Sequence, residues 1–164
     1  NQHTKVRTLL GSCVSITLWH PDLKVGGICH YMLPERTRAN TARHDGKYAE
    51  EAFMLLLREV EKCGAPLREY EAKLFGGGNM FPRDTRCPKN NVGQRNAEVG
   101  KSLLTRHGLT PRAQHVGGAG HRTLIFDISN GDVWVKLSEL PAPAACDQCE
   151  LAGECFPQKQ TQFI

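Results

Sequence analysis

Near the start of the chain, a cysteine and a histidine carry side chains that could together form a nucleophilic centre. Cys13 follows a Gly-Ser pair, and His30 lies in the next apolar segment. An imidazole beside a thiol takes up the thiol proton, and the resulting thiolate is a far better nucleophile. The hydroxyl of Thr8 could orient the second imidazole nitrogen, as a carboxylate does in other triads. Cys13 is therefore a candidate nucleophile, His30 a candidate for its base, and Thr8 a candidate for the orienting hydroxyl.

The residues directly before Cys13 are suited to binding a carbonyl oxygen. Gly11 has no Cβ, so the backbone can bend there and a substrate carbonyl can approach closely. The backbone N–H groups near Ser12 and Cys13 are therefore candidates for an oxyanion hole. The alternative is a structural cysteine, because unpaired cysteine is among the most buried residue types and Cys13 has apolar neighbours.

Two predicted strands must position these side chains. Apolar and polar residues alternate over 14–19, which predicts a strand with one buried face. A second apolar run, 28–33, follows two glycines and stops at Pro34.

The relative position of Cys13 and His30 depends on how these strands pair. If 14–19 and 27–32 form an antiparallel hairpin centred between Pro21 and Asp22, Cys13 is directly opposite His30, with Cβ atoms about 5 Å apart. A slip by one residue would put the two side chains on opposite faces. A longer irregular turn over 20–26 is equally allowed.

The rest of the chain supplies helices and further strands. Helical spacing of apolar residues predicts one helix over 49–63 and a second over 98–107, each ended by a glycine. Strands are expected over 6–10 and 72–75, and Asn130-Gly131 between alternating segments predicts a hairpin over 124–135. Hairpins separated by helices indicate an α+β domain and not a doubly wound parallel sheet.

Composition excludes several classes of protein. The 164 residues (18.2 kDa) are 40% hydrophobic and 23% charged, enough apolar material for a core, so a wholly disordered chain is excluded. The net charge of +4 is scattered, which gives no support to nucleic-acid binding. No apolar stretch approaches the roughly 20 residues of a membrane span, so we expect no membrane insertion.

The seven cysteines suggest a reducing compartment and a separate tail. An odd count without an export signal favours reduced thiols in the cytosol. The composition changes at Pro141, so we expect a domain over 1–140 and a linker with a cysteine-containing tail over 141–164. Cys146, Cys149 and Cys155 have spacing that can bind zinc or an iron–sulfur cluster, although either normally needs a fourth ligand. The alternative is a tail of free thiols.

Two glycine-rich segments, 76–79 and 117–120, allow two interpretations. They are backbone turns that support the site, or they are phosphate-binding loops. Neither has the full P-loop pattern or a dinucleotide fingerprint, so we favour the turns.

Five segments, in order, resemble the CheD family of chemoreceptor glutamine deamidases. They are 8–14 (TLLGSCV), 26–34 (GGICHYMLP), 73–81 (KLFGGGNMF), 92–96 (VGQRN) and 116–120 (VGGAG). The resemblance ends near Leu137. His115 stands where the family usually has an acidic residue.

This resemblance implies a fold, an activity and partners. The fold would be mixed β-sheets packed in layers with flanking helices, as in cytotoxic necrotizing factor toxins. The activity would be hydrolysis of glutamine side-chain amides in methyl-accepting chemoreceptors, with Cys13, His30 and Thr8 as the catalytic residues and no metal or organic cofactor. The partners would be chemoreceptors and, in some bacteria, the phosphatase CheC, in the cytoplasm. The alternative is an adaptor that binds receptor or CheC without turnover.

Overall fold

A computed structural model describes residues 4–37, 43–80 and 91–138. The tail over 141–164, with Cys146, Cys149 and Cys155, lies outside the described residues, as does the predicted domain boundary. The elements, in chain order, are β1 (Lys5–Leu10), β2 (Val14–His20), β3 (Val25–Tyr31), α1 (Ala49–Glu61), a short 3₁₀ turn (Leu67–Glu69), β4 (Glu71–Gly76), α2 (Val92–Arg106), β5 (Pro111–Val116), β6 (His121–Asp127) and β7 (Val133–Ser138).

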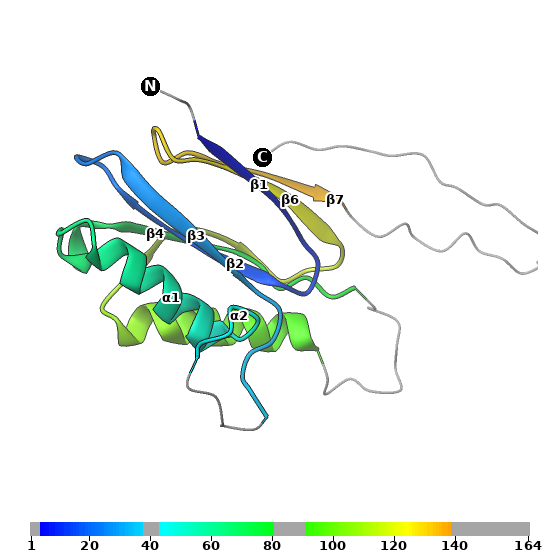
Figure 1. Cartoon of the computed structure of the whole chain (residues 1–164). Coiled ribbons are helices and arrows are strands. Elements are labelled where there is room, and N and C mark those ends of the chain that lie inside the picture. Colours follow the sequence, from blue (N-terminus) through cyan, green and yellow to red (C-terminus); the bar gives the residue numbers. More distant parts are fainter. Residues whose placement is uncertain (1–3, 38–42, 81–90, 139–164) are drawn as a thin grey trace, which may run out of the picture.

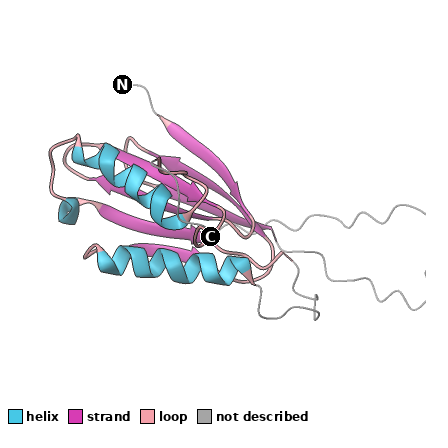
Figure 2. Cartoon of the chain, turned by 60° about the horizontal axis from the view of Figure 1, so that its bottom comes forward, coloured by secondary structure: helices cyan, strands magenta, loops and turns pink. Residues whose placement is uncertain are grey.

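These elements form three layers (Figure 1). A four-stranded sheet in the order β3-β2-β4-β5 lies in the middle. A three-stranded sheet in the order β1-β6-β7 covers one of its faces, and α1 and α2 cover the other. Figure 2 shows both helices on the same side of the strands. Only β4 and β5 pair in parallel among the described strands. The predicted α+β class of layered mixed sheets is therefore confirmed.

Strand β2 separates two hydrophobic cores. We predicted one buried face, but all seven of its residues are buried, because the strand is central and both of its faces are covered. Val14, Ile16 and Leu18 pack towards the helices. Trp19 packs between the sheets with four other buried apolar residues: Leu10, Phe75, Leu124 and Phe126. These five residues are called the inter-sheet core below.

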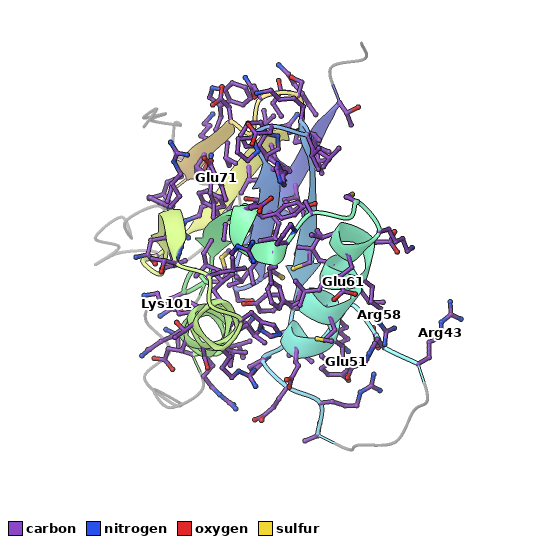
Figure 3. The ribbon with its side chains drawn as sticks, turned by 90° about the vertical axis from the view of Figure 1, so that its left-hand side faces the viewer. Arg43, Glu51, Arg58, Glu61, Glu71 and Lys101 are labelled. Carbon is purple, nitrogen blue, oxygen red and sulfur yellow. The ribbon has the colours of Figure 1, made fainter. Side chains whose placement is uncertain are left out.

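Helix α1 has the expected amphipathic character but ends earlier than predicted. Its buried face includes Phe53 and Leu56, and Glu50 and Glu51 lie in the first turn, where the helix dipole favours negative charge. The helix ends at Glu61, and Cys63 is exposed in the following turn. The charged side chains of Arg58 in α1 and Lys101 in α2 are exposed (Figure 3).

Helix α2 begins earlier than predicted, and the strand after it was not predicted. Asn91 caps the helix by accepting a hydrogen bond from the backbone N–H of Gln94 at 3.1 Å. The first turns bury Gly93, Asn96 and Gly100, which carry no apolar signal, so the hydrophobic periodicity starts only further along. Strand β5 then runs parallel to β4 at the edge of the middle sheet.

The predicted hairpin around Asn130-Gly131 is confirmed. Strands β6 and β7 pair antiparallel, with Phe126 opposite Val133. The hairpin loop contacts the middle sheet, because Trp19 Nε1 donates a hydrogen bond to Ile128 O at 2.9 Å. In the described part of the chain, neither helix has the length and apolar character needed to cross a bilayer.

Candidate active site

The predicted catalytic residues meet where the chain crosses from one sheet to the other. Strand β1 is an edge of the three-stranded sheet, and β3 is an edge of the middle sheet. The three residues 11–13 connect β1 to β2 and so pass between the layers. Thr8 comes from β1, His30 from β3, and Cys13 from the connection. The site therefore requires both sheets.

The hydroxyl of Thr8 and the imidazole of His30 form a hydrogen bond between the sheets. Thr8 Oγ1 lies 2.9 Å from His30 Nδ1. When Nδ1 carries the hydrogen, it donates to Thr8 Oγ1, and the lone pair of Nε2 is free to accept a proton from a thiol. This is the arrangement that we predicted for an orienting hydroxyl.

The predicted pairing of Cys13 with His30 was wrong by two residues. His30 is opposite Ser15 in the ladder, and the last pair before the site is Val14 with Tyr31. The turn is longer than assumed, because four residues (21–24) separate the strands and Lys24 has a positive φ of 54°. A two-residue shift keeps side chains on the same face. Cys13 is therefore diagonal to His30 on the face towards the three-stranded sheet, and among the described residues no hydrogen bond joins thiol and imidazole.

The segment before β2 is held by all three of its carbonyl groups. Residues 11–13 are called the nucleophile loop below. Each carbonyl accepts a hydrogen bond from a different donor: Gly11 O from Gly78 N at 2.8 Å, Ser12 O from Asn96 Nδ2 at 2.9 Å, and Cys13 O from Gly77 N at 2.8 Å. By contrast, the N–H groups of Ser12 and Cys13 form no hydrogen bond with any other described residue. These two N–H groups were the predicted oxyanion donors, and that of Cys13 also interacts with the thiol of its own residue.

The first glycine-rich segment acts as a backbone support for this loop. Gly76 has a φ of 114°, and a Cβ built there would lie 2.2 Å from Cys13 O. Only glycine permits this conformation and this close approach. The N–H groups of Gly77 and Gly78 already bond to the nucleophile loop, so they cannot also bind a phosphate. The structure thus favours the backbone-turn interpretation.

The second glycine-rich segment is held by the first and by a buried arginine. Asn79 N–H donates to Gly118 O at 2.7 Å. The Arg122 side chain is buried, donates from Nε to His115 Nδ1 at 2.7 Å, and also donates to Gly117 O. Burial, together with the charge of Arg122, lowers the pKa of His115. A neutral His115 therefore serves as the hydrogen-bond acceptor here.

Desolvation shifts the pKa values of both reactive groups towards their uncharged forms. It raises the pKa of the Cys13 thiol above its ordinary value, an effect that a backbone hydrogen bond only partly offsets. It also lowers the pKa of His30 below its ordinary value. Both shifts favour the neutral thiol and the neutral imidazole. His30 is thus in the state of a general base, and the thiolate would form only as the proton is transferred.

Our sequence interpretation did not assign a role to Asn96. Its side chain is completely buried, and Nδ2 donates to Ser12 O and, at 2.8 Å, to Met32 O. The signal that could have identified it is a polar residue on the buried face of a helix, flanked by Gly93 and Gly100. Such an amide is buried only when its hydrogen atoms have acceptors.

The predicted metal ligands are in the C-terminal tail. Cys146, Cys149 and Cys155 are outside the described residues. Within the described ranges no cluster of three or more His, Cys, Asp or Glu residues is arranged to hold a metal ion.

Comparisons with known proteins identify relatives of the chain. A family model described as CheD chemotactic sensory transduction matches residues 32–137. The probable chemoreceptor glutamine deamidase CheD 3 of Dechloromonas aromatica is 49% identical over 137 residues, which is 84% of this chain and 80% of the relative. The CheD protein of Pseudomonas fluorescens, with the same type of name, is 48% identical over 81% of this chain and 75% of its own length. That of Desulforamulus reducens is 39% identical over 80% of each chain.

Proposed function

The chain belongs to the CheD family, and from that premise we propose that it is a chemoreceptor glutamine deamidase that works through a cysteine thioester. The relatives are named for this activity. The observation that supports the mechanism most directly is the 2.9 Å contact between Thr8 Oγ1 and His30 Nδ1. It orients an imidazole at the same junction of the two sheets that carries Cys13.

The first half of the reaction transfers the glutamine acyl group to sulfur. His30 accepts the proton of the Cys13 thiol while the sulfur attacks the carboxamide carbon, forming a C–S bond. The carbonyl oxygen takes the negative charge and is stabilised by the N–H groups of Ser12 and Cys13. The C–N bond then breaks, protonated His30 gives its proton to the departing nitrogen, and ammonia leaves.

The second half hydrolyses the thioester. Neutral His30 removes a proton from a water molecule, whose oxygen attacks the same carbon. The C–S bond breaks, the sulfur recovers a proton from His30, and the product carboxylic acid loses its proton to water and leaves as a glutamate side chain. His30 carries the protons exchanged with the thiol, the departing nitrogen and the attacking water, so this route uses only thiol, imidazole and water.

Ammonia release from a chemoreceptor cytoplasmic fragment tests this proposal. We expect wild-type protein to release ammonia and to convert glutamine to glutamate, as read by mass spectrometry, and Cys13→Ala to release none. Cys63→Ala is the matched control, because it removes an exposed thiol that lies outside the site. Equal release by wild type and Cys13→Ala would refute the thiol mechanism. No release by either protein would favour an adaptor that binds without turnover.

Three further assignments belong to this proposal. We assign the protein to the cytoplasm, because the receptor segments it modifies would be on that side. Binding of the phosphatase CheC and binding of metal by Cys146, Cys149 and Cys155 stay predictions. Pull-down with purified CheC tests the first, and metal analysis of purified full-length protein, compared with a variant in which the three cysteines are serines, tests the second.

A further inference from the structure

We infer that Asn96 is a positioning residue that aims the backbone N–H of Cys13 at the carbonyl oxygen of the substrate. This inference rests on the proposed function and adds a residue from α2 to the machinery. Among the described residues, Asn96 is the only one whose side chain donates a hydrogen bond to the nucleophile loop. Asn96 is also completely buried, so its contacts are shielded from competition with water.

Peptide geometry connects the Asn96 amide to the Cys13 N–H. In a trans peptide, the N–H of one residue points opposite to the C=O of the preceding residue, and the described chain has no cis peptide bond. The Ser12 carbonyl points towards α2, where it accepts from Asn96 Nδ2 at 2.9 Å. The Cys13 N–H must therefore point away from α2. The reactive face of Cys13 and His30 lies on that same side of the middle sheet, away from the helices.

The second hydrogen of the Asn96 amide holds this side chain in place. It bonds to the residue that follows β3, the strand that carries His30. Nδ2 also donates to Met32 O at 2.8 Å, just beyond the end of β3. In the register of the ladder, Cys13 and Met32 would form the next pair, but the ladder stops at Val14 and Tyr31. There the chain leaves β2, since Met32 N–H bonds to Lys47 O at 3.0 Å. The Asn96 amide thus bridges the two segments at the point where the sheet no longer does.

A close approach of α2 makes this bridge possible. A Cβ on Gly93 would lie 2.4 Å from Gly78 O, and one on Gly100 would lie 2.5 Å from the Tyr31 hydroxyl. The two glycines flank Asn96 on the buried face of the helix. They allow the helix backbone to come near enough for a short amide side chain to reach both carbonyl groups.

A different hydrogen bond at the same residue provides a matched control. The hydroxyl of buried Tyr31 donates to the backbone O of Asn96 at 2.8 Å. Tyr31→Phe removes this bond but leaves both contacts of the Asn96 amide in place. It should therefore reproduce the loss of stability that comes from one missing buried hydrogen bond, without disturbing the Ser12–Cys13 peptide.

The test compares kcat, KM, melting temperature and thiol reactivity for four proteins: wild type, Asn96→Ala, Asn96→Leu and Tyr31→Phe. Leucine has nearly the shape of asparagine but no hydrogen to donate. We expect both Asn96 variants to lose about 10²-fold in kcat with little change in KM. Alkylation of Cys13 by iodoacetamide develops no oxyanion, so its rate should stay close to that of wild type. Tyr31→Phe should lower the melting temperature comparably and keep its kcat.

Two results would overturn the inference. One is full kcat in a folded Asn96 variant while wild type is active. The other is an equal loss of kcat in Tyr31→Phe, or of alkylation rate in the Asn96 variants, which would indicate a purely structural role. Absence of ammonia release by wild type would instead refute the proposed function.

A measurement on the wild-type protein covers the case in which the Asn96 variants do not fold. A receptor peptide with an aldehyde in place of the glutamine carboxamide would add to the Cys13 thiol and form a hemithioacetal. In ¹⁵N-labelled protein, the Cys13 amide should then show the largest downfield change of all assigned backbone amides. An unchanged Cys13 amide in the adduct would contradict the inference.

Discussion

His30 relies on a single hydroxyl for its orientation, since Thr8 Oγ1 is its one hydrogen-bond partner among the described residues. Thr8→Val keeps the shape of the side chain but removes the hydroxyl. We expect it to lower kcat by about 10- to 100-fold, because the ring then loses the bond that selects its tautomer. Thr8→Ser keeps the hydroxyl and should retain most of the activity. The same kcat in Thr8→Val and wild type would show that His30 is oriented by packing alone.

The pKa shifts of the two reactive groups predict a specific dependence on pH. Because the pKa of Cys13 is raised, its thiolate fraction increases with pH and the rate of alkylation by iodoacetamide should still be rising at pH 9. Because the pKa of His30 is lowered from 6.5, the base stays neutral below that pH, and kcat/KM should persist there. The alkylation is measured on Cys63→Ala, with the modified peptide identified by mass spectrometry. A plateau of the rate below pH 8 would instead indicate a thiolate–imidazolium pair.

The end of β4 shapes the nucleophile loop. Gly76 adopts a positive φ next to Cys13 O, whereas Gly108, after α2, adopts a positive φ of 71° with open space around it. Alanine at either position strains the backbone by about 1 kcal/mol or more. Only Gly76→Ala also places a methyl group against the nucleophile loop.

We therefore expect Gly76→Ala to lose both stability and most of its activity, and Gly108→Ala to lose stability alone. The melting temperature and the rate of ammonia release, measured well below both melting temperatures, distinguish the two effects. Equal activities of the two variants would show that the nucleophile loop tolerates displacement of its support.

At the scale of the whole molecule, the distance between Thr8 and His30 depends on how the two sheets pack. Phe126 is completely buried in the inter-sheet core, whereas Leu104 is completely buried between the helices and the middle sheet. Truncation of either residue to alanine costs about 2–5 kcal/mol, a large part of the stability of a typical domain.

We expect Phe126→Ala to lower kcat, because a cavity between the sheets loosens the contact between β1 and β3. Leu104→Ala should be similarly destabilised but should keep its kcat at a temperature where both variants are folded. Unfolding by urea, combined with ammonia release at low temperature, provides the comparison. The same kcat in both variants would show that the inter-sheet core does not control the site.

Local patterns in the amino-acid sequence were enough to predict several elements. Apolar periodicity located α1, alternation located β2, and Asn130-Gly131 located the last hairpin, because each pattern lies within a short stretch of chain. The residue types in the first thirty positions also identified Cys13, His30 and Thr8 as candidates for one site, and the structure places these residues at one junction. Their catalytic roles stay predictions.

How these residues meet depends on contacts between segments that are distant in the sequence. The length of the turn set the register, so His30 faces Ser15 rather than Cys13. The start of α2 and the contacts of Asn96 were not predicted for a related reason. The buried face of this part of the helix consists of glycine and amide groups, which give no apolar signal. Their contribution to packing depends on the backbone that lies against them. Strand β5 likewise depends on its parallel partner β4. Contacts between distant segments cannot be read from local patterns, because each side supplies only half of the interaction.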